Sequence, residues 1–198
     1  TLSPVLRSVV SVARNLAWDR VTSENDRSSS NGWANVASLI GVTTASSYVE
    51  VNFNNACNLK CSYCSPQFSS SWQQEAERHG AFPTLVPHNA AEHFSGSRRP
   101  IPARDHNPYV DAFWAWWPTL YPELKHFRMT GGEPLMDKNT YRVFDYVLAN
   151  PSKKLHLNVT SNFSVEPELF KRYLDSVKSI CDGRIEHFMQ YVSVDSGT

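Results

Sequence analysis

Polar and apolar residues alternate along four segments of the chain, at residues 48–53, 125–130, 155–161 and 185–195. Such alternation is typical of β-strands, in which successive side chains point to opposite faces of the sheet. We therefore expect a sheet with one polar face and one apolar face that packs against helices. The polar positions are Glu50, Asn52, His126, Arg128, Thr130, His156, Asn158, Thr160, Asn162, Ser193 and Asp195.

Apolar residues at helical spacing predict helices between these strands, at residues 67–79, 138–149 and 167–181. An aromatic segment at 109–117 predicts another helix, whose length Pro118 and Pro122 should limit. Strands and helices alternate without a hairpin signal after residue 125, which indicates parallel strands joined by crossover helices. The predicted fold is α/β: a partial (βα) barrel of parallel strands with helices outside and a polar cavity inside, truncated after about four strands.

The sequence divides into two regions that differ in composition and hydrophobic pattern. Residues 1–47 combine an amphipathic stretch, with Val9, Val12 and Leu16 near helical spacing, and a run rich in Ser and Asn, so we expect a helix and a linker. Residues 48–198 form the predicted core, with a long proline-rich loop at 80–108. The chain begins at Thr1 and stops just after an apolar strand, so we expect it to be part of a longer protein.

The composition excludes several classes of protein. Nineteen Lys and Arg balance nineteen Asp and Glu, which argues against a nucleic-acid-wrapping protein. Hydrophobic residues make up 41% and aromatic residues 12%, enough for a substantial core. No apolar run approaches the roughly 18 residues of a membrane span, and the N-terminus lacks the pattern of a signal peptide. We expect a cytoplasmic protein that neither enters a membrane nor binds nucleic acid.

Three of the four cysteines, Cys57, Cys61 and Cys64, fall on one short segment with C-x3-C-x2-C spacing. Three thiolates suit an iron-sulfur cluster or zinc. A structural zinc site is normally closed by four protein ligands, and the nearest candidates for the fourth, His79 and His88, have a mutual spacing outside the usual zinc-finger range. A four-iron cluster held by three cysteines leaves one iron open for a small molecule. Cys181 lies far away, and we expect it to be a buried or half-buried side chain at a helix end.

A second motif, at residues 130–134, follows the second predicted strand. Paired Gly131 and Gly132 allow a close backbone approach, and the Glu133 carboxylate can accept a hydrogen bond from an ammonium group. Ligands of open α/β sheets bind at the ends of strands, where this motif lies. Taken alone, the motif is also consistent with a glycine-rich turn before a helix capped by Asp137.

Together these motifs resemble the signature of radical S-adenosylmethionine (radical SAM) enzymes. The resemblance implies that Cys57, Cys61 and Cys64 hold a [4Fe-4S] cluster whose open iron chelates S-adenosylmethionine. It also implies that the aromatic residue before the last cysteine, Tyr63, lies near the adenine. Residues 131–133 resemble the GGE motif, so Gly131, Gly132 and Glu133 would bind the amino group of the methionine moiety.

Weaker similarities occupy the ends of the third and fourth strands. The sequence ending at Asn162 resembles a Thr-Asn turn beside the cofactor, and Ser193 resembles a serine that contacts the cofactor carboxylate. Asp195 would lie close by, on the substrate side. The spacing is most similar to the branch with SPASM or twitch extensions, although the fifth and sixth strands and the cysteines for an auxiliary cluster are absent from this sequence.

The resemblance implies reductive cleavage of S-adenosylmethionine to a 5'-deoxyadenosyl radical that abstracts hydrogen from a peptide or a small molecule. It implies an electron donor such as flavodoxin or ferredoxin, and it assigns no catalytic side chain. The alternatives are an activase that installs a glycyl radical on a partner, and a non-catalytic iron-sulfur or zinc-binding module. Arg128 is expected to face the cavity and to pair with Glu50, Glu133, Asp195 or a ligand carboxylate.

Overall fold

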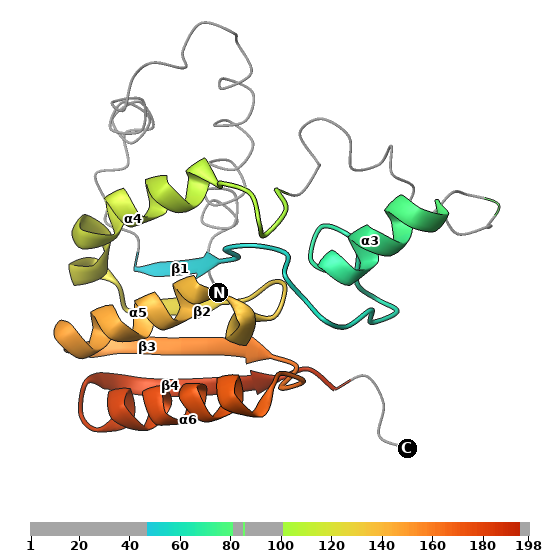
Figure 1. The fold of residues 1–198 in the computed structure, drawn as a ribbon. Coiled ribbons are helices and arrows are strands. Elements are labelled where there is room, and N and C mark those ends of the chain that lie inside the picture. The colour runs from blue at the N-terminus through green and yellow to red at the C-terminus, as the bar shows by residue number, and fades with distance from the viewer. Residues whose placement is uncertain (1–46, 81–84, 86–100, 195–198) are drawn as a thin grey trace, which may run out of the picture.

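A computed structural model describes residues 47–80, 85 and 101–194 of the chain. All but the last residue of the predicted helix and linker (1–47), most of the 80–108 loop, and Asp195 lie outside the described residues. Within them the chain folds into a parallel sheet covered by helices (Figure 1).

The sheet has four strands in the order β1-β2-β3-β4, and all neighbouring pairs are parallel. The strands are β1 (Tyr48–Val51), β2 (His126–Met129), β3 (Ser152–Ser161) and β4 (Ile185–Val192). The predicted α/β class and parallel sheet are therefore confirmed. The sheet of the described residues is open, because β1 and β4 are its two outer strands.

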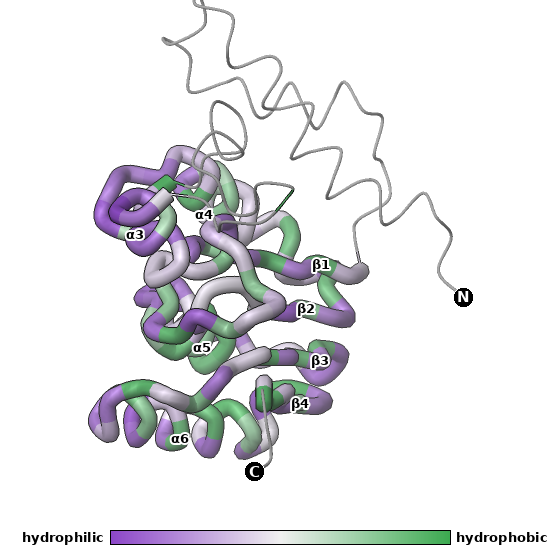
Figure 2. The backbone as a smooth tube through the Cα atoms, turned by 90° about the vertical axis from the view of Figure 1, so that its right-hand side faces the viewer, coloured by the Kyte–Doolittle hydropathy of each residue, from purple (hydrophilic) through white to green (hydrophobic). Residues whose placement is uncertain are grey.

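The helices are α3 (Ser70–His79), α4 (Pro108–Leu120), α5 (Lys138–Ala149) and α6 (Pro167–Cys181), with short 3-10 helices η3 (Tyr121–Glu123) and η4 (Pro134–Met136). The sequence predicted the bounds of α5 and α6. Gly80 ends α3 as expected, with a positive φ of 77° and its N–H bonded to the carbonyl of Ala76. Figure 2 shows α4, α5 and α6 on the same side of the sheet.

Helix α4 continues through Pro118 to Leu120, beyond the length that the sequence predicted. Proline inside a helix removes a hydrogen bond and costs about 3 kcal/mol. In α4 the last turn is held by burial, because Trp117 is 0% exposed and Leu120 is 3% exposed. Core packing thus overrides the local preference.

The core lies between the sheet and its helices. On the strands it is formed by the alternate apolar residues, with Phe127, Leu157 and Val159 fully buried. The predicted apolar face is confirmed for β1, β2 and β3. However, Val192, the last residue of β4, and Val194, just beyond it, are exposed, although we expected both to lie on a strand and to contact helices. Strand β4 is an outer strand of the described sheet, where helical cover is incomplete.

The opposite face of the sheet is polar, as predicted. Glu50 pairs in register with Arg128, and Arg128 with Asn158, and all three are half-buried. Within the described residues no helix covers this face (Figure 2). Because the described sheet is open, these residues by themselves do not enclose the cavity that the sequence predicted.

Among the described residues, no helix has the length and apolar character needed to cross a bilayer.

Candidate functional site

The predicted site residues that the structure describes follow the carboxyl ends of the strands. The cysteine loop follows β1, the GGE turn follows β2 and the Asn162 turn follows β3 (Figure 1). Parallel strands end at the same edge of a sheet, which brings segments far apart in the sequence together.

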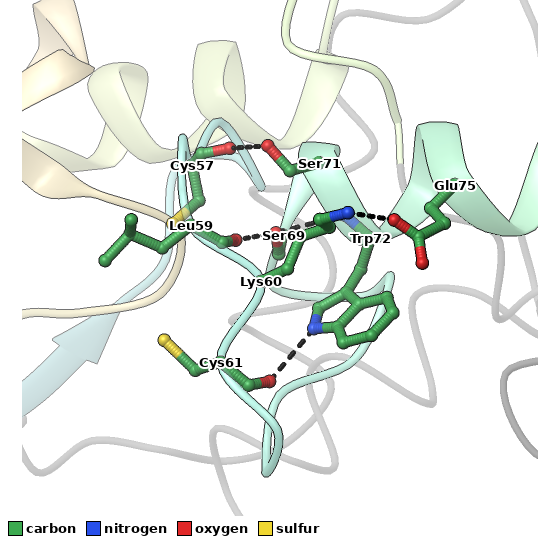
Figure 3. Close-up of polar contacts among 8 residues, drawn as sticks. All are labelled: Cys57, Leu59, Lys60, Cys61, Ser69, Ser71, Trp72 and Glu75. Carbon is green, nitrogen blue, oxygen red and sulfur yellow. Dashed lines mark hydrogen bonds and ion pairs between the residues drawn. The ribbon is translucent and has the colours of Figure 1, made fainter. Parts of the chain in front are cut away.

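The cysteine loop is anchored to the start of α3 by three consecutive serines. The Ser70 hydroxyl bonds both the N–H and the carbonyl of Cys57 at 3.1 Å, and Ser71 donates to the same carbonyl at 2.8 Å (Figure 3). Ser69 donates to the carbonyl of Leu59 at 2.7 Å and also caps α3. The loop therefore has a defined path without help from its thiol groups.

The middle of the loop rests on Trp72, whose indole N–H donates to the carbonyl of Cys61 at 2.9 Å (Figure 3). The Cys61 thiol points away from α3 in this view. Cys57 is buried, Cys61 and Cys64 are half-buried, and Tyr63 is 71% exposed. Two thiols and the aromatic ring are thus accessible from solvent.

The GGE turn packs directly on the cysteine loop. The Glu133 N–H donates to the carbonyl of Ala56 at 2.6 Å. Gly131 and Gly132 have positive φ values of 74° and 53°. A β-carbon on Gly131 would lie 2.2 Å from the Asn52 side chain, and one on Gly132 would lie 2.6 Å from the Ala56 carbonyl oxygen. Both positions therefore require glycine, because of backbone conformation and close approach.

The Glu133 carboxylate connects the ends of β2 and β3. Its Oε1 accepts from the Ser161 hydroxyl at 2.6 Å and from the Leu135 N–H at 3.0 Å, and its Oε2 accepts from the Asn162 N–H at 2.7 Å. The residue is only 2% exposed. A carboxylate offers about four acceptor positions, so one position on Oε2 remains.

The Asn162 turn closes the site from the side of β3. Its Nδ2 lies 3.7 Å from Cys57 Sγ and 3.5 Å from Asn58 Oδ1. Its Oδ1 accepts from the Ser164 N–H at 2.7 Å, which fixes the turn. Phe163 has a positive φ of 57°, an uncommon conformation for a bulky residue.

Burial shifts the pKa values of one thiol and one carboxyl group at this site. Burial raises the pKa of the Cys57 thiol, and the backbone N–H of Leu59 opposes this shift. Without a bound metal, Cys57 therefore stays protonated at neutral pH. Burial also raises the pKa of Asp137, while hydrogen bonds from Asn139 lower it. Asp137 caps α5, as predicted, and accepts from Asn54 Nδ2 at 2.5 Å.

The chemistry of the donor set fits an iron-sulfur cluster. Three thiols stand on one loop, and a metal displaces protons from thiols when it binds. In the described part of the chain no three His, Cys, Asp or Glu side chains already converge on one point, so the three thiols would have to come closer together to hold a cluster. Asn52 Oδ1, beside Gly131, is buried and has no hydrogen-bond partner among the described residues. An ammonium group bound there would satisfy it.

Other predicted residues lie apart from this group. Ser193 is exposed, and its N–H donates to the carbonyl of Ser161 at 3.0 Å, so it continues the pairing of β3 and β4 at the same edge. Asp195 is outside the described residues. Cys181 does end α6, but it is exposed and neither buried nor half-buried as expected; its neighbour Ile180 is the residue of the last turn that enters the core.

Sequence reasoning did not identify three groups that support the site. These are Ser161, which binds Glu133, the serines that hold the cysteine loop, and Asn54, which joins that loop to Asp137. The run Ser69-Ser70-Ser71 at a helix start was a usable signal, since serine caps helices. Nothing local distinguishes Asn54 or Ser161.

Comparisons of this chain with family models, with curated proteins and with solved structures found no match.

Proposed function

We propose that this chain is the core of a radical SAM enzyme. Cys57, Cys61 and Cys64 would hold a [4Fe-4S] cluster, with S-adenosylmethionine on the open iron. The observation that carries the proposal is the meeting of three separate motifs at one edge of the sheet. The GGE turn donates to the cysteine loop at 2.6 Å, and Asn162 lies 3.7 Å from Cys57 Sγ and binds Glu133.

When bound, the cluster would supply the reductive cleavage of S-adenosylmethionine to a 5'-deoxyadenosyl radical. This radical would abstract hydrogen from substrate. The residues of this chain would bind and orient the cluster and S-adenosylmethionine. Tyr63 would contact the adenine, and residues 131–133 with Asn162 would border the methionine moiety. Asn52 Oδ1 would accept from its amino group, and Ser193 and Asp195 would complete the site on the side of β4.

The proposal includes a barrel that further strands would complete around the polar face, with α4, α5 and α6 outside it. It also includes an electron donor of the flavodoxin or ferredoxin type, a peptide or small-molecule substrate and a reducing, cytoplasmic setting. None of the four cysteines, all of which lie in the described residues, forms a disulfide, and a reducing setting would keep the three loop thiols available for iron.

A second candidate is a non-catalytic iron-sulfur or zinc-binding module. The burial of the Glu133 carboxylate favours it, because this group is largely used in joining β2 to β3. In this module the glycines and Glu133 would only hold the cysteine loop in place.

Anaerobic reconstitution with iron and sulfide, followed by metal analysis, separates the two. The radical SAM proposal expects about four irons and four sulfides per chain, and a reduced electron paramagnetic resonance signal that shifts when S-adenosylmethionine is added. One zinc without sulfide, or a cluster signal that ignores the cofactor, would contradict it.

Two cysteine variants make a matched pair for this experiment. Cys61→Ala should abolish cluster assembly, whereas Cys181→Ala, at the exposed end of α6, should leave it unchanged. Neither thiol is fully buried, so both proteins should fold. Equal iron content in the two variants would rule out the assignment.

Tyr63→Ala then tests the cofactor position. Because Tyr63 is 71% exposed, its loss should spare cluster assembly. Stacking of an aromatic ring contributes about 1 kcal/mol, so affinity for S-adenosylmethionine should fall about fivefold in a titration of the shifted signal. An unchanged affinity would remove Tyr63 from the site.

A further inference from the structure

Arg128 lies in the middle of the polar face of the sheet, on the inner strand β2. Its Nη2 donates to Thr160 Oγ1 at 3.2 Å, and its guanidinium carbon lies 4.8 Å from the centre of the Tyr191 ring. Its side chain is 32% exposed. Contacts from β3 and β4 therefore hold the guanidinium in position while part of it faces solvent.

The hydrogen-bonding capacity of this guanidinium is only partly used. Its Nε is buried and has no partner among the described residues. Its Nη1 lies 3.9 Å from Glu50 Oε2, which is an ion-pair distance and too long for a hydrogen bond. The expected pairing with Glu50 is thus confirmed as a charge contact. A guanidinium presents five N–H donors in a fixed fork, and among the described residues Thr160 and the Tyr48 hydroxyl accept from only part of them.

Glu50 is also engaged elsewhere. Its Oε2 accepts from the Tyr48 hydroxyl at 2.9 Å, and its Oε1 accepts from the Thr130 hydroxyl at 3.1 Å. Both carboxylate oxygens of Glu50 thus have other donors beside the charge contact with Arg128. Glu50 therefore offsets the charge of Arg128 without filling its donors.

Few acidic side chains stand at the paired positions around Arg128 in the described sheet. His126, His156 and His187 are cross-strand partners, with ring centres 4.7 Å and 5.7 Å apart. Among the paired positions that the structure describes on this face, Glu50 is the only acidic residue.

We propose that Arg128 binds a carboxylate group of the substrate, which makes the substrate a carboxylic acid such as an amino acid or a peptide. This rests on the proposed function, which brings substrate to the polar face. Thr160 lies two residues before Asn162, so the Arg128 site is about 7 Å along the strands from the candidate cofactor edge. A carboxylate matches the planar fork with two parallel hydrogen bonds.

The test uses the full chain, labelled with 15N, and follows the arginine Nε–H signals by nuclear magnetic resonance. Sodium acetate replaces sodium chloride at constant ionic strength, so that screening stays the same. The Arg128 signal, assigned by its loss in Arg128→Lys, should shift and saturate. The Arg172 signal is the matched control, because that guanidinium lies 4.0 Å from the ring of Tyr141 on the helical side, and it should not move.

Isothermal titration calorimetry with acetate should then show binding weakened about tenfold in Arg128→Lys, which keeps the charge but loses the fork, and unchanged in Arg172→Lys. An Arg128 signal that ignores acetate overturns the proposal. A response to inorganic phosphate without one to acetate also overturns it, and assigns the site to a phosphorylated substrate.

The titration is independent of cluster assembly, so the two proposals can fail separately. Acetate binding in a chain that assembles no iron-sulfur cluster would leave the anion site standing and refute the radical SAM proposal. A cluster that responds to S-adenosylmethionine in a chain without acetate binding would refute only the role of Arg128.

Discussion

The apolar layer between the sheet and its helices and the carboxyl edge of the same sheet are held together by different kinds of interaction. The layer is held by non-directional burial of large side chains such as Trp117, Phe127 and Phe144, which are all 0% exposed. The edge is held by a few directional contacts between loops, including those of Glu133 with Ala56 and Ser161. Stability therefore resides mainly in the layer, whereas the arrangement of the candidate site depends on single atoms.

The largest effect should follow a cavity in the apolar layer. Trp117→Ala removes a fully buried ring that packs on Phe127 at a centroid distance of 4.8 Å, and should lower the free energy of unfolding by about 3–5 kcal/mol. Trp116→Ala, which removes a ring 46% exposed on the same helix, should cost much less. Urea unfolding measures both, and equal losses would show that α4 does not bury Trp117.

A smaller loss is expected where the GGE turn meets the cysteine loop. Gly132→Ala places a β-carbon 2.6 Å from a backbone oxygen at a φ of 53°, and should destabilise the protein by about 2 kcal/mol or more. Gly183→Ala, at a φ of 66° with only the flexible end of Lys153 nearby, carries the conformational cost alone.

The difference between the two glycine variants measures how tightly the turn packs on the loop. It should appear both in the free energy of unfolding and in iron uptake, which only Gly132→Ala should reduce. Similar behaviour of the two variants would contradict the close packing described at the edge.

The hydrogen bond from Ser161 to Glu133 should contribute about 1–3 kcal/mol, because its loss leaves a buried carboxylate with one partner fewer. Ser161→Ala removes that donor with little change in volume. Ser176→Ala removes an exposed hydroxyl that bonds its own helix and should change stability by less than about 0.5 kcal/mol. Thermal unfolding compares the two, and no difference would indicate that the edge is looser than the layer.

The smallest effect concerns the open polar face. Burial lowers the pKa of His126, and the charges of His156 and Lys125 lower it further. The unfolded chain then binds more protons than the folded chain between the lowered pKa and about 6.5. The contribution of His126 is therefore complete above about pH 6.5 and is lost as the pH falls through the lowered pKa.

His126→Gln should accordingly reduce the dependence of unfolding free energy on pH between roughly 7 and 5. Lys154→Gln, a change at an exposed residue outside the paired histidines, should leave the slope unchanged. If the slope is the same in the His126 variant and the unchanged protein, His126 does not contribute to the pH dependence of stability.

Local pattern predicted much of this fold. Helices α5 and α6 have the bounds that their apolar spacing and the Asp137 cap indicated. The alternation in β2 and β3 predicted which face is buried. Two expectations failed where tertiary packing acts: α4 continues through Pro118, and Val192 on the outer strand β4 is exposed.

The sequence by itself determined the parallel α/β order and the spacing of the cysteines, because hydrophobic period and motif spacing are local properties of the chain. Only the tertiary structure decided that Ser161 binds Glu133, that Asn162 reaches Cys57 and which of the expected carboxylates lies beside Arg128. These pairs are distant along the chain and meet because parallel strands in register bring them to one edge and one face. Local pattern carries no signal of such contacts, which depend on how strands are ordered and aligned.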